Sequence, residues 1–270
     1  MYFSEIALNF IGGMDVDKLL ENNPSEQNKV CAILTPHAGY SYSGDVSARA
    51  FNSVKKKKYE NVFILSTSHT ASFPFACIPE DGSYETPYGI MKINKGLNLE
   101  KIVRLNQVIR EYNGHFKNDH TIEIELPFIQ KTIDYENIVP IMVGENNTTN
   151  LYEISKVLEP YFTDDNLFVI SSDFSHYPDY KEALIIDEAT KNLILKKNSK
   201  DFINDIFQTQ NMSNNVVTRM CGWSAYLILL FLIEKRNDIE INVLRYKNSF
   251  EAFGDRNRTV GYFGMNFIKK

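Results

Sequence analysis

Apolar residues along this chain gather in short continuous runs, separated by polar turns and amphipathic segments. The most continuous runs lie at residues 30–34, 61–66 and 167–172. A run of this length bounded by turn residues is typical of a strand buried on both faces, as strands of parallel sheets are. After the first run, apolar residues recur at helical spacing over residues 46–54, which predicts a helix there.

Further segments complete an alternating order of strands and helices. Shorter apolar runs predict strands at residues 75–79, 89–93, 138–143, 240–246 and 259–267. Helices are predicted at residues 14–20, 97–112, 151–161, 181–196, 200–208 and 225–233. Asp119 could cap another helix that runs to about residue 133, and Pro127 should kink it or end its first part. Residues 81–87 are predicted as a loop, and residues 6–11 fit either a strand or a helix start.

This order predicts one α/β domain with a mixed sheet over residues 1–270, because no linker, low-complexity tract or internal repeat divides the chain. The hydrophobic fraction is 43% and the formal net charge is −5, with acids and bases mixed along the sequence. The basic run at residues 55–58 fits a helix end, so no nucleic-acid partner is expected. Since no apolar run reaches the length of a bilayer span, no membrane partner is expected either.

The cysteines and the first residues bear on the compartment. Three cysteines, at positions 31, 77 and 221, are too few and too scattered for a disulfide framework. Residues 1–10 lack the basic start and the small-residue cleavage site of a signal peptide. These features predict a cytoplasmic protein with reduced thiols.

Histidines recur at the ends of the predicted strands and at helix starts. His37 and His69 follow the first two long runs, His176 follows the third, and His120 lies next to the predicted helix cap Asp119. In open α/β sheets, ligands bind beyond the carboxyl ends of the strands. One histidine in such a place is more often structural, but the repeated placement favours a functional site. The fifth, His115, lies in a polar loop and is expected to be solvated.

Cys221 adds a thiol to this set. It precedes Gly222 at the start of an apolar helix, where the helix N-terminus could stabilise a thiolate. Cys31 and Cys77 lie within strand-like runs, so each is predicted to be a small buried hydrophobic residue. Imidazole and thiolate ligands suit iron, copper or zinc. The paired cysteine spacing of structural zinc sites is absent, so a metal here would be catalytic or would bind substrate.

Other polar residues are candidates for the surroundings of this site. Asp173 and His176 could orient ligands or act as acid and base. His120 and Glu123, three residues apart on one predicted helix face, form a possible orienting pair at the rim. Tyr40 and Tyr42 could gate or hydrogen-bond a ligand, although half-buried aromatic residues are the ordinary alternative.

Five motifs occur together in one order: PHAGYSYSG at 36–44, STSH at 66–69, DHTIEIELPF at 119–128, SSDFSH at 171–176 and CG at 221–222. Their order and spacing resemble the Memo family, called AmmeMemoRadiSam system protein B in bacteria and archaea. The resemblance implies a three-layer α/β sandwich with a mostly parallel central sheet, similar to class III extradiol dioxygenases. It implies His37, His69 and Cys221 as metal ligands, with Asp173 and His176 in the same pocket. Fe(II) is the expected metal, with Cu or Zn as alternatives.

The resemblance also bears on activity and partners. Eukaryotic relatives are linked to iron or copper binding, redox signalling and phosphotyrosine peptides, and prokaryotic members accompany a radical-SAM protein and an AMMECR-type protein. Trp223 follows Gly222 here, where the family often has a basic residue, so an anion site at that position is not expected. The related dioxygenases use a carboxylate where this chain offers Cys221, so ring cleavage does not carry over to this chain.

Three functions therefore stay open at the level of sequence. The first is a mononuclear metal protein with redox or dioxygenase-like chemistry on a small-molecule or peptide ligand. The second is a hydrolase or acyltransferase with Cys221 as nucleophile, His37 or His176 as base and Asp173 as orienter. The third is a non-catalytic module that uses the same pocket to bind a peptide or small anion.

Overall fold

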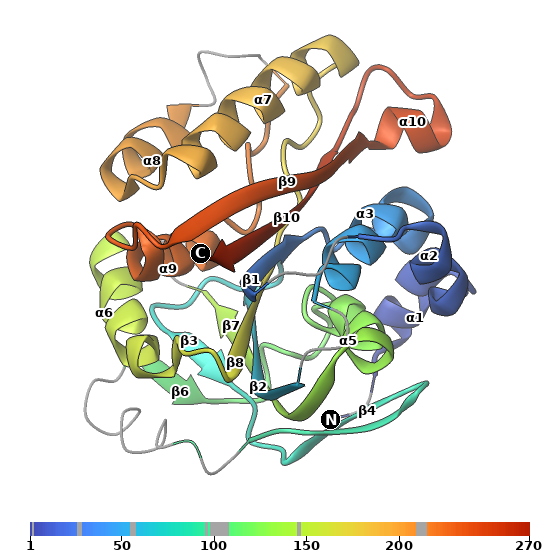
Figure 1. Ribbon diagram of the computed structural model, residues 1–270. Coiled ribbons are helices and arrows are strands. Elements are labelled where there is room, and N and C mark those ends of the chain that lie inside the picture. Colours follow the sequence, from blue (N-terminus) through green and yellow to red (C-terminus); the bar gives the residue numbers. More distant parts are fainter. Residues whose placement is uncertain are drawn as a thin grey trace.

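The computed structural model describes residues 1, 3–25, 29–54, 58–94, 97, 108–144, 147–208 and 215–270. An eight-stranded sheet, in the order β6-β3-β7-β2-β8-β1-β10-β9, runs through the molecule, and β4 and β5 form a separate hairpin (Figure 1). The strands are β1 Val30–Thr35, β2 Lys58–Thr67, β3 Ala76–Ile78, β4 Ser83–Thr86, β5 Gly89–Lys92, β6 Ile109–Glu111, β7 Asp134–Val143, β8 Asn166–Ser171, β9 Ile239–Asn248 and β10 Gly261–Lys269. The central strands β7, β2, β8 and β1 are parallel, and β10 and β9 are antiparallel additions at one edge.

Helices cover both faces of this sheet. They are α1 Glu5–Ile11, α2 Val16–Asn22, α3 Tyr40–Asn52, α5 Leu126–Thr132, α6 Thr148–Leu158, α7 Tyr180–Lys196, α8 Ser199–Ile206, α9 Trp223–Ile233 and α10 Ser249–Phe253. Two short 3-10 helices, η1 Glu123–Glu125 and η2 Glu159–Tyr161, join them. Each strand residue packs on the side opposite to its neighbour, because side chains alternate along a strand. Leu34, Leu65 and Ile170 join a core that contains residues of α6 and α9.

The neighbouring residues Ile33, Ile64 and Val169 join a second core, which contains residues of α3 and α5. Two cores on opposite faces of one sheet make the predicted three-layer α/β sandwich, which the structure confirms. The segment Trp223–Ile233 is apolar all round and buried over Ser224–Leu230, as a helix in the middle of such a layer should be. No helix among the described residues is long and apolar enough to span a bilayer.

Most predicted strands and helices are present, and three predictions are corrected. The single helix predicted from Asp119 is instead η1 followed by α5, and Pro127 lies in the first turn of α5, where its missing N–H costs nothing. Residues 97–112 were expected to be helical. Ile109–Glu111 instead pairs with β3 as an edge strand, and residues 98–107 lie outside the described part. The predicted loop at 81–87 contains β4, which pairs with β5.

The strand order decides where the polar residues meet. Since β1 and β2 both pair in parallel with β8, the carboxyl ends of these three strands lie side by side. His37, His69 and Asp173 follow these ends directly, so the topology gathers them at one edge of the sheet.

Candidate metal centre

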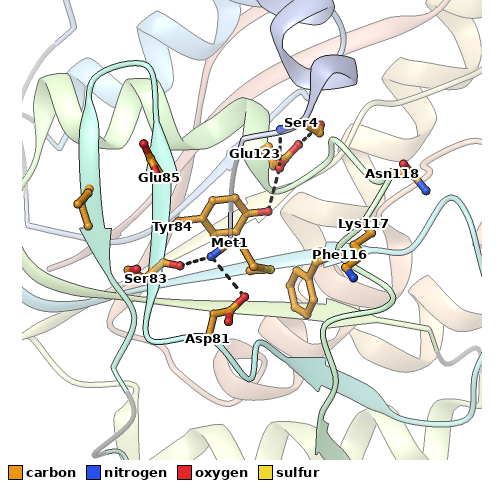
Figure 2. Close-up of a pocket in the computed structure, with 11 residues that line it drawn as sticks. Met1, Ser4, Asp81, Ser83, Tyr84, Glu85, Phe116, Lys117, Asn118 and Glu123 are labelled. Atoms are coloured by element: carbon orange, nitrogen blue, oxygen red, sulfur yellow. Dashed lines mark hydrogen bonds and ion pairs between the residues drawn. The ribbon is translucent and has the colours of Figure 1, made fainter.

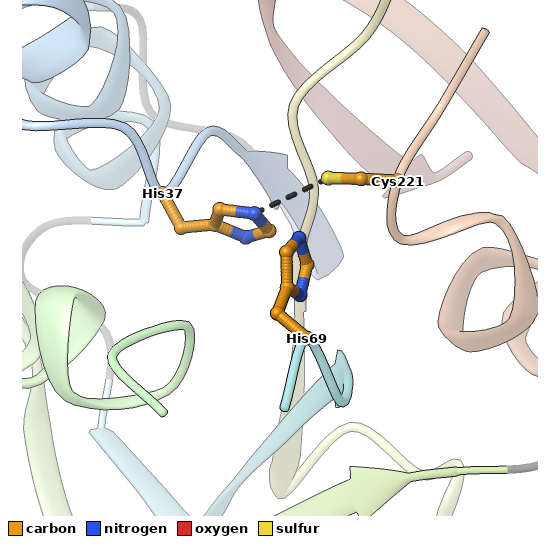
Figure 3. Close-up of side chains that lie close together, drawn as sticks. All are labelled: His37, His69 and Cys221. Atoms are coloured by element: carbon orange, nitrogen blue, oxygen red, sulfur yellow. Dashed lines mark hydrogen bonds between the residues drawn. The ribbon is translucent and has the colours of Figure 1, made fainter. Parts of the chain in front are cut away.

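His37, His69 and Cys221 form a cluster whose ligand atoms all lie within 4.8 Å of one another. Figure 3 shows the two imidazole rings and the sulfur pointing toward one shared space. The sulfur of Cys221 lies 3.2 Å from Nε2 of His37, and the two rings meet edge to face with centroids 4.9 Å apart. His37 is buried, Cys221 is half-buried and His69 is exposed, so the cluster opens to its surroundings on the side of His69.

Backbone contacts around Asp173 hold His37 and Cys221 in place. One carboxylate oxygen of Asp173 accepts hydrogen bonds from the backbone N–H groups of His37, at 2.9 Å, and Ala38, at 3.3 Å. The backbone N–H of Asp173 donates to the Cys221 sulfur at 3.2 Å, and the N–H of Cys221 donates to the Asp173 carbonyl. A Cβ at Gly222 would lie 2.5 Å from the Ser172 side chain, so glycine is what lets this loop approach β8 closely.

Hydrogen bonds define the tautomers of both histidines. Nδ1 of His69 lies 2.9 Å from the carbonyl of Thr67, which can only accept, so Nδ1 carries the proton. Nδ1 of His37 lies 2.8 Å from Ser171 Oγ. The Ser171 O–H donates a hydrogen bond to the Thr121 carbonyl at 2.6 Å. Ser171 must therefore accept from His37 Nδ1–H. In both rings Nε2 keeps its lone pair free for a metal or a proton.

Burial sets the charge states at the site. It lowers the pKa of His37 well below its usual value, with further lowering by the neighbouring histidines, so the ring is neutral. Burial and the Asp173 carboxylate raise the pKa of the Cys221 thiol, contrary to the expected stabilisation by the helix N-terminus. The sulfur is therefore a thiol in the absence of a metal. Burial also raises the pKa of Asp173 to about 7, although the N–H groups of His37 and Ala38 oppose the shift.

These donors fit a transition metal. Two imidazole nitrogens and one sulfur converge on one point, and such ligands suit iron, copper or zinc rather than magnesium or calcium. A bound cation would supply the positive charge that deprotonates Cys221. Three protein ligands leave coordination positions open, as in catalytic centres.

A cavity of about 470 Å³ adjoins the cluster. It is lined by Phe10, His37, Ala38, Gly39, Tyr42, His69, His120, Asp173, His176, Tyr177, Ser249, Arg258, Val260 and Tyr262. Tyr42, His120, Asp173 and His176 thus lie in the predicted pocket. His120 stacks on Phe10 with centroids 3.8 Å apart, and burial lowers its pKa to about 4. Nε2 of His176 lies 4.0 Å from Asp173 Oδ2, and burial lowers the pKa of His176 to about 4 as well.

Two predicted pocket residues lie elsewhere. The hydroxyl of Tyr40 donates to the Ile124 carbonyl at 2.7 Å, and the buried ring packs on Phe128, so Tyr40 supports the core. Glu123 lines a separate cavity of about 640 Å³, where it accepts hydrogen bonds from Ser4 and from the Tyr84 hydroxyl (Figure 2). His120 and Glu123 therefore face different cavities and do not form an orienting pair, because η1 begins only at Glu123.

Several residues at the site were not predicted from the sequence. Ser171 and Thr67 fix the tautomers, but a serine and a carbonyl at a strand end carry no distinctive signal. Arg258 lies in the segment between α10 and β10, where no pattern marks it. His115, which was expected to be solvated, is half-buried and stacks on Phe73 at 3.8 Å.

Comparisons with known proteins agree with this architecture. Residues 14–266 match the family described as Memo-like protein. The chain is 30% identical over 259 residues to a MEMO1 family protein of Aquifex aeolicus, covering 94% of this chain and 91% of the relative. It is 29% identical over 275 residues to the Caenorhabditis elegans protein memo-1 homolog, covering 93% of this chain and 76% of that protein.

The fold also has a solved counterpart. The crystal structure of an uncharacterized protein from Escherichia coli K12 superposes with a TM-score of 0.57 at 11% sequence identity. The match covers 88% of this chain and 98% of the other, which shows a shared α/β fold and no more. Since the family match extends over nearly the whole chain, including every residue of the cluster, this protein belongs to the Memo-like protein family.

Proposed function

We propose that this protein is a mononuclear metal protein that holds iron on His37, His69 and Cys221 and uses it for redox chemistry on a small molecule. The observation that carries the proposal is the pair of unprotonated Nε2 atoms directed at one point beside a sulfur. Iron bound there would supply electron transfer and Lewis-acid polarisation of a ligand. The remaining chemistry falls to the chain's own side chains.

Asp173 and His176 lie in the adjoining cavity, where they could bind protons or hydrogen-bond a ligand. With its pKa raised to about 7 by burial, the Asp173 carboxyl can hold or release a proton near neutral pH. His176 stays neutral at that pH because burial lowers its pKa to about 4, so it is a weak base that can accept a hydrogen bond. Phe10 and Tyr42 form walls that orient a substrate and exclude water.

Metal analysis tests this proposal. Protein purified without oxygen and without added metal should contain about one iron per chain by elemental analysis. His37→Ala and Cys221→Ala should lose it, because each removes one of three ligands. Cys77→Ala is the control, since it removes another thiol of the chain that lies in β3, outside the cluster. Equal iron content in wild type and Cys221→Ala would exclude the cluster as the metal site.

A specific observation favours a second candidate, a module that binds a small anion. Arg258 lines the cavity, its guanidinium lies 4.2 Å over the Tyr177 ring, and no ion pair of Arg258 is found among the described residues. Burial raises the pKa of the one carboxyl in the lining, Asp173, to about 7, so it is only partly ionised at neutral pH. The cavity therefore offers a cation to an anionic ligand whether or not turnover follows.

The nucleophile hypothesis receives less support. The distance of 3.2 Å between Cys221 and His37 suits a Cys-His pair, but burial and Asp173 raise the pKa of the thiol. Asp173 binds the backbone of His37, and Ser171, not Asp173, orients the His37 ring. Cytoplasmic location and partnership with radical-SAM and AMMECR-type proteins stay predictions from sequence.

A further inference from the structure

A row of three hydroxyl groups lies beneath the metal centre. Thr35, Ser66 and Ser171 are partners in register across the parallel strands β1, β2 and β8, with Ser171 in the middle. Each follows a residue that faces α6 and α9, so all three side chains point to the opposite face, toward α3 and α5. All three residues are fully buried. Ser171 is the residue that accepts the hydrogen bond from His37 Nδ1.

Glu125 of η1 lies beside Ser171 and Thr35 of this row. Its side chain is fully buried, and neither of its carboxyl oxygens has a hydrogen-bond partner at bonding geometry. The hydroxyls of Thr35 and Ser66 are also buried without a partner. Leaving such groups unpaired costs about 1–3 kcal/mol each, so a folded protein is expected to bring them together.

The surroundings of Glu125 determine its charge. Burial raises its pKa well above the ordinary value, and the hydroxyls of Ser171 and Thr35 lie near enough to lower it partly. Asp173 raises it further. Burial therefore favours the neutral carboxyl, which has one O–H to donate and one carbonyl oxygen to accept.

We propose that the neutral carboxyl of Glu125 is a positioning group for His37, donating its O–H to Ser171 and accepting from the hydroxyl of Thr35. The Ser171 oxygen then accepts two hydrogen bonds, from Glu125 and from His37 Nδ1. Its own O–H continues to donate to the Thr121 carbonyl. Ser171 cannot turn to donate to His37, and the His37 ring is held in the tautomer whose Nε2 is free.

This arrangement matters for the metal because partners behind a ligand fix its orientation and basicity, and their loss typically lowers metal affinity 10- to 100-fold. That consequence rests on the proposed metal site. The tautomer itself does not, since it is set by protein groups alone and can be measured in metal-free protein.

The test compares three substitutions at one residue. Glu125→Gln keeps one donor and one acceptor and should retain the single Nδ1–H tautomer of His37, read from ¹⁵N NMR shifts of the metal-free protein. Glu125→Met removes both groups, and Glu125→Asp withdraws the carboxyl by one methylene. Both should give mixed tautomers and bind Zn²⁺ 10- to 100-fold more weakly. Glu123→Gln is the matched control, because it lies in the same η1 helix but faces the other cavity.

The outcomes separate the two proposals. A folded Met or Asp variant with the wild-type tautomer and wild-type Zn²⁺ affinity would overturn the role of Glu125. If Glu125→Met does not fold, Glu125→Asp is compared with Glu125→Gln. A purely structural role of Glu125 would leave the ¹⁵N shifts of the His37 ring the same in both variants, whereas a positioning role would change them only in Glu125→Asp. If wild type binds no metal but the tautomer changes as expected, the metal proposal fails and the positioning role stands.

Discussion

The sulfur of Cys221 lies 3.2 Å from Nε2 of His37, although 184 residues separate the two along the chain. Since Ser171 fixes the His37 proton on Nδ1, Nε2 can only accept, and the thiol is the donor of this contact. A metal at this point would replace the thiol proton. Metal binding and proton release are therefore expected to be linked.

The first prediction concerns this linkage. Because burial and Asp173 raise the pKa of Cys221, Zn²⁺ binding at pH 7 should release about one proton, and affinity should rise about tenfold per pH unit between pH 6 and 8. Calorimetry in buffers of different ionisation enthalpy counts the released protons. Binding that releases none would mean that the thiolate already exists without metal, which would favour the nucleophile hypothesis.

A second prediction concerns Gly222. A Cβ there would lie 2.6 Å from the Ser171 carbonyl and 2.5 Å from the Ser172 side chain, so the Cys221 loop would have to move away from β8. Gly222→Ala should lower the free energy of unfolding by about 1–3 kcal/mol, as overpacking does. It should also weaken Zn²⁺ binding more than tenfold, because the sulfur moves with the loop.

The control for this substitution is Gly82→Ala, where a new Cβ meets nothing within 4 Å. Chemical denaturation and Zn²⁺ titration of the two variants, side by side with wild type, give the comparison. Unchanged Zn²⁺ affinity in Gly222→Ala would show that the loop position is not what places the sulfur.

The third prediction uses His120 and pH. Burial lowers its pKa to about 4 in the folded protein, against about 6.5 when unfolded. Between these values the unfolded chain binds a proton that the folded chain does not, so stability falls as the pH drops from 7 to 5. In metal-free His120→Gln this fall should be smaller by about 1–2 kcal/mol.

Urea unfolding at pH 7 and pH 5 measures this difference. His115→Gln is the comparison and should change this fall less, because burial lowers the pKa of His115 in its loop beside Phe73 only slightly. The same pH dependence in wild type and His120→Gln would contradict the assigned burial of His120.

Much of the site could be predicted because strand ends in a parallel sheet meet. His37, His69 and Asp173 each follow a continuous apolar run, and the pairing of β1, β8 and β2 brings them together. Cys221 could be placed because it precedes an apolar helix. Each of these signals is local in sequence, and the order of the parallel strands determines where the residues come together.

The residues that were misplaced or missed depend on tertiary contacts. The pattern from Asp119 to about residue 133 suggests one helix with His120 and Glu123 on one face. The first helical turn begins only at Glu123, and the two side chains reach different cavities. Glu125 was not singled out because an acid between apolar residues carries no distinctive signal, yet it is fully buried beside Thr35 and Ser171. Arg258 lies in an irregular segment whose path only the packed structure defines.

The last prediction concerns Arg258 and the charge of the ligand. A charge-assisted hydrogen bond from a guanidinium to an anion contributes about 1.5–3 kcal/mol, so Arg258→Gln should weaken binding of inorganic phosphate to metal-free protein by about tenfold or more. Arg256→Gln is the matched control, because this substitution removes the same charge only two residues away. Arg256 stacks on Phe250 and does not line the cavity. Calorimetric titration at two salt concentrations separates a direct contact from a long-range effect of charge. Loss of a long-range attraction would weaken phosphate binding equally in both variants, and the difference from wild type would disappear at high salt. Equal losses in the two variants would assign the effect to net charge, whereas a loss confined to Arg258→Gln would identify this guanidinium as the anchor of an anionic ligand.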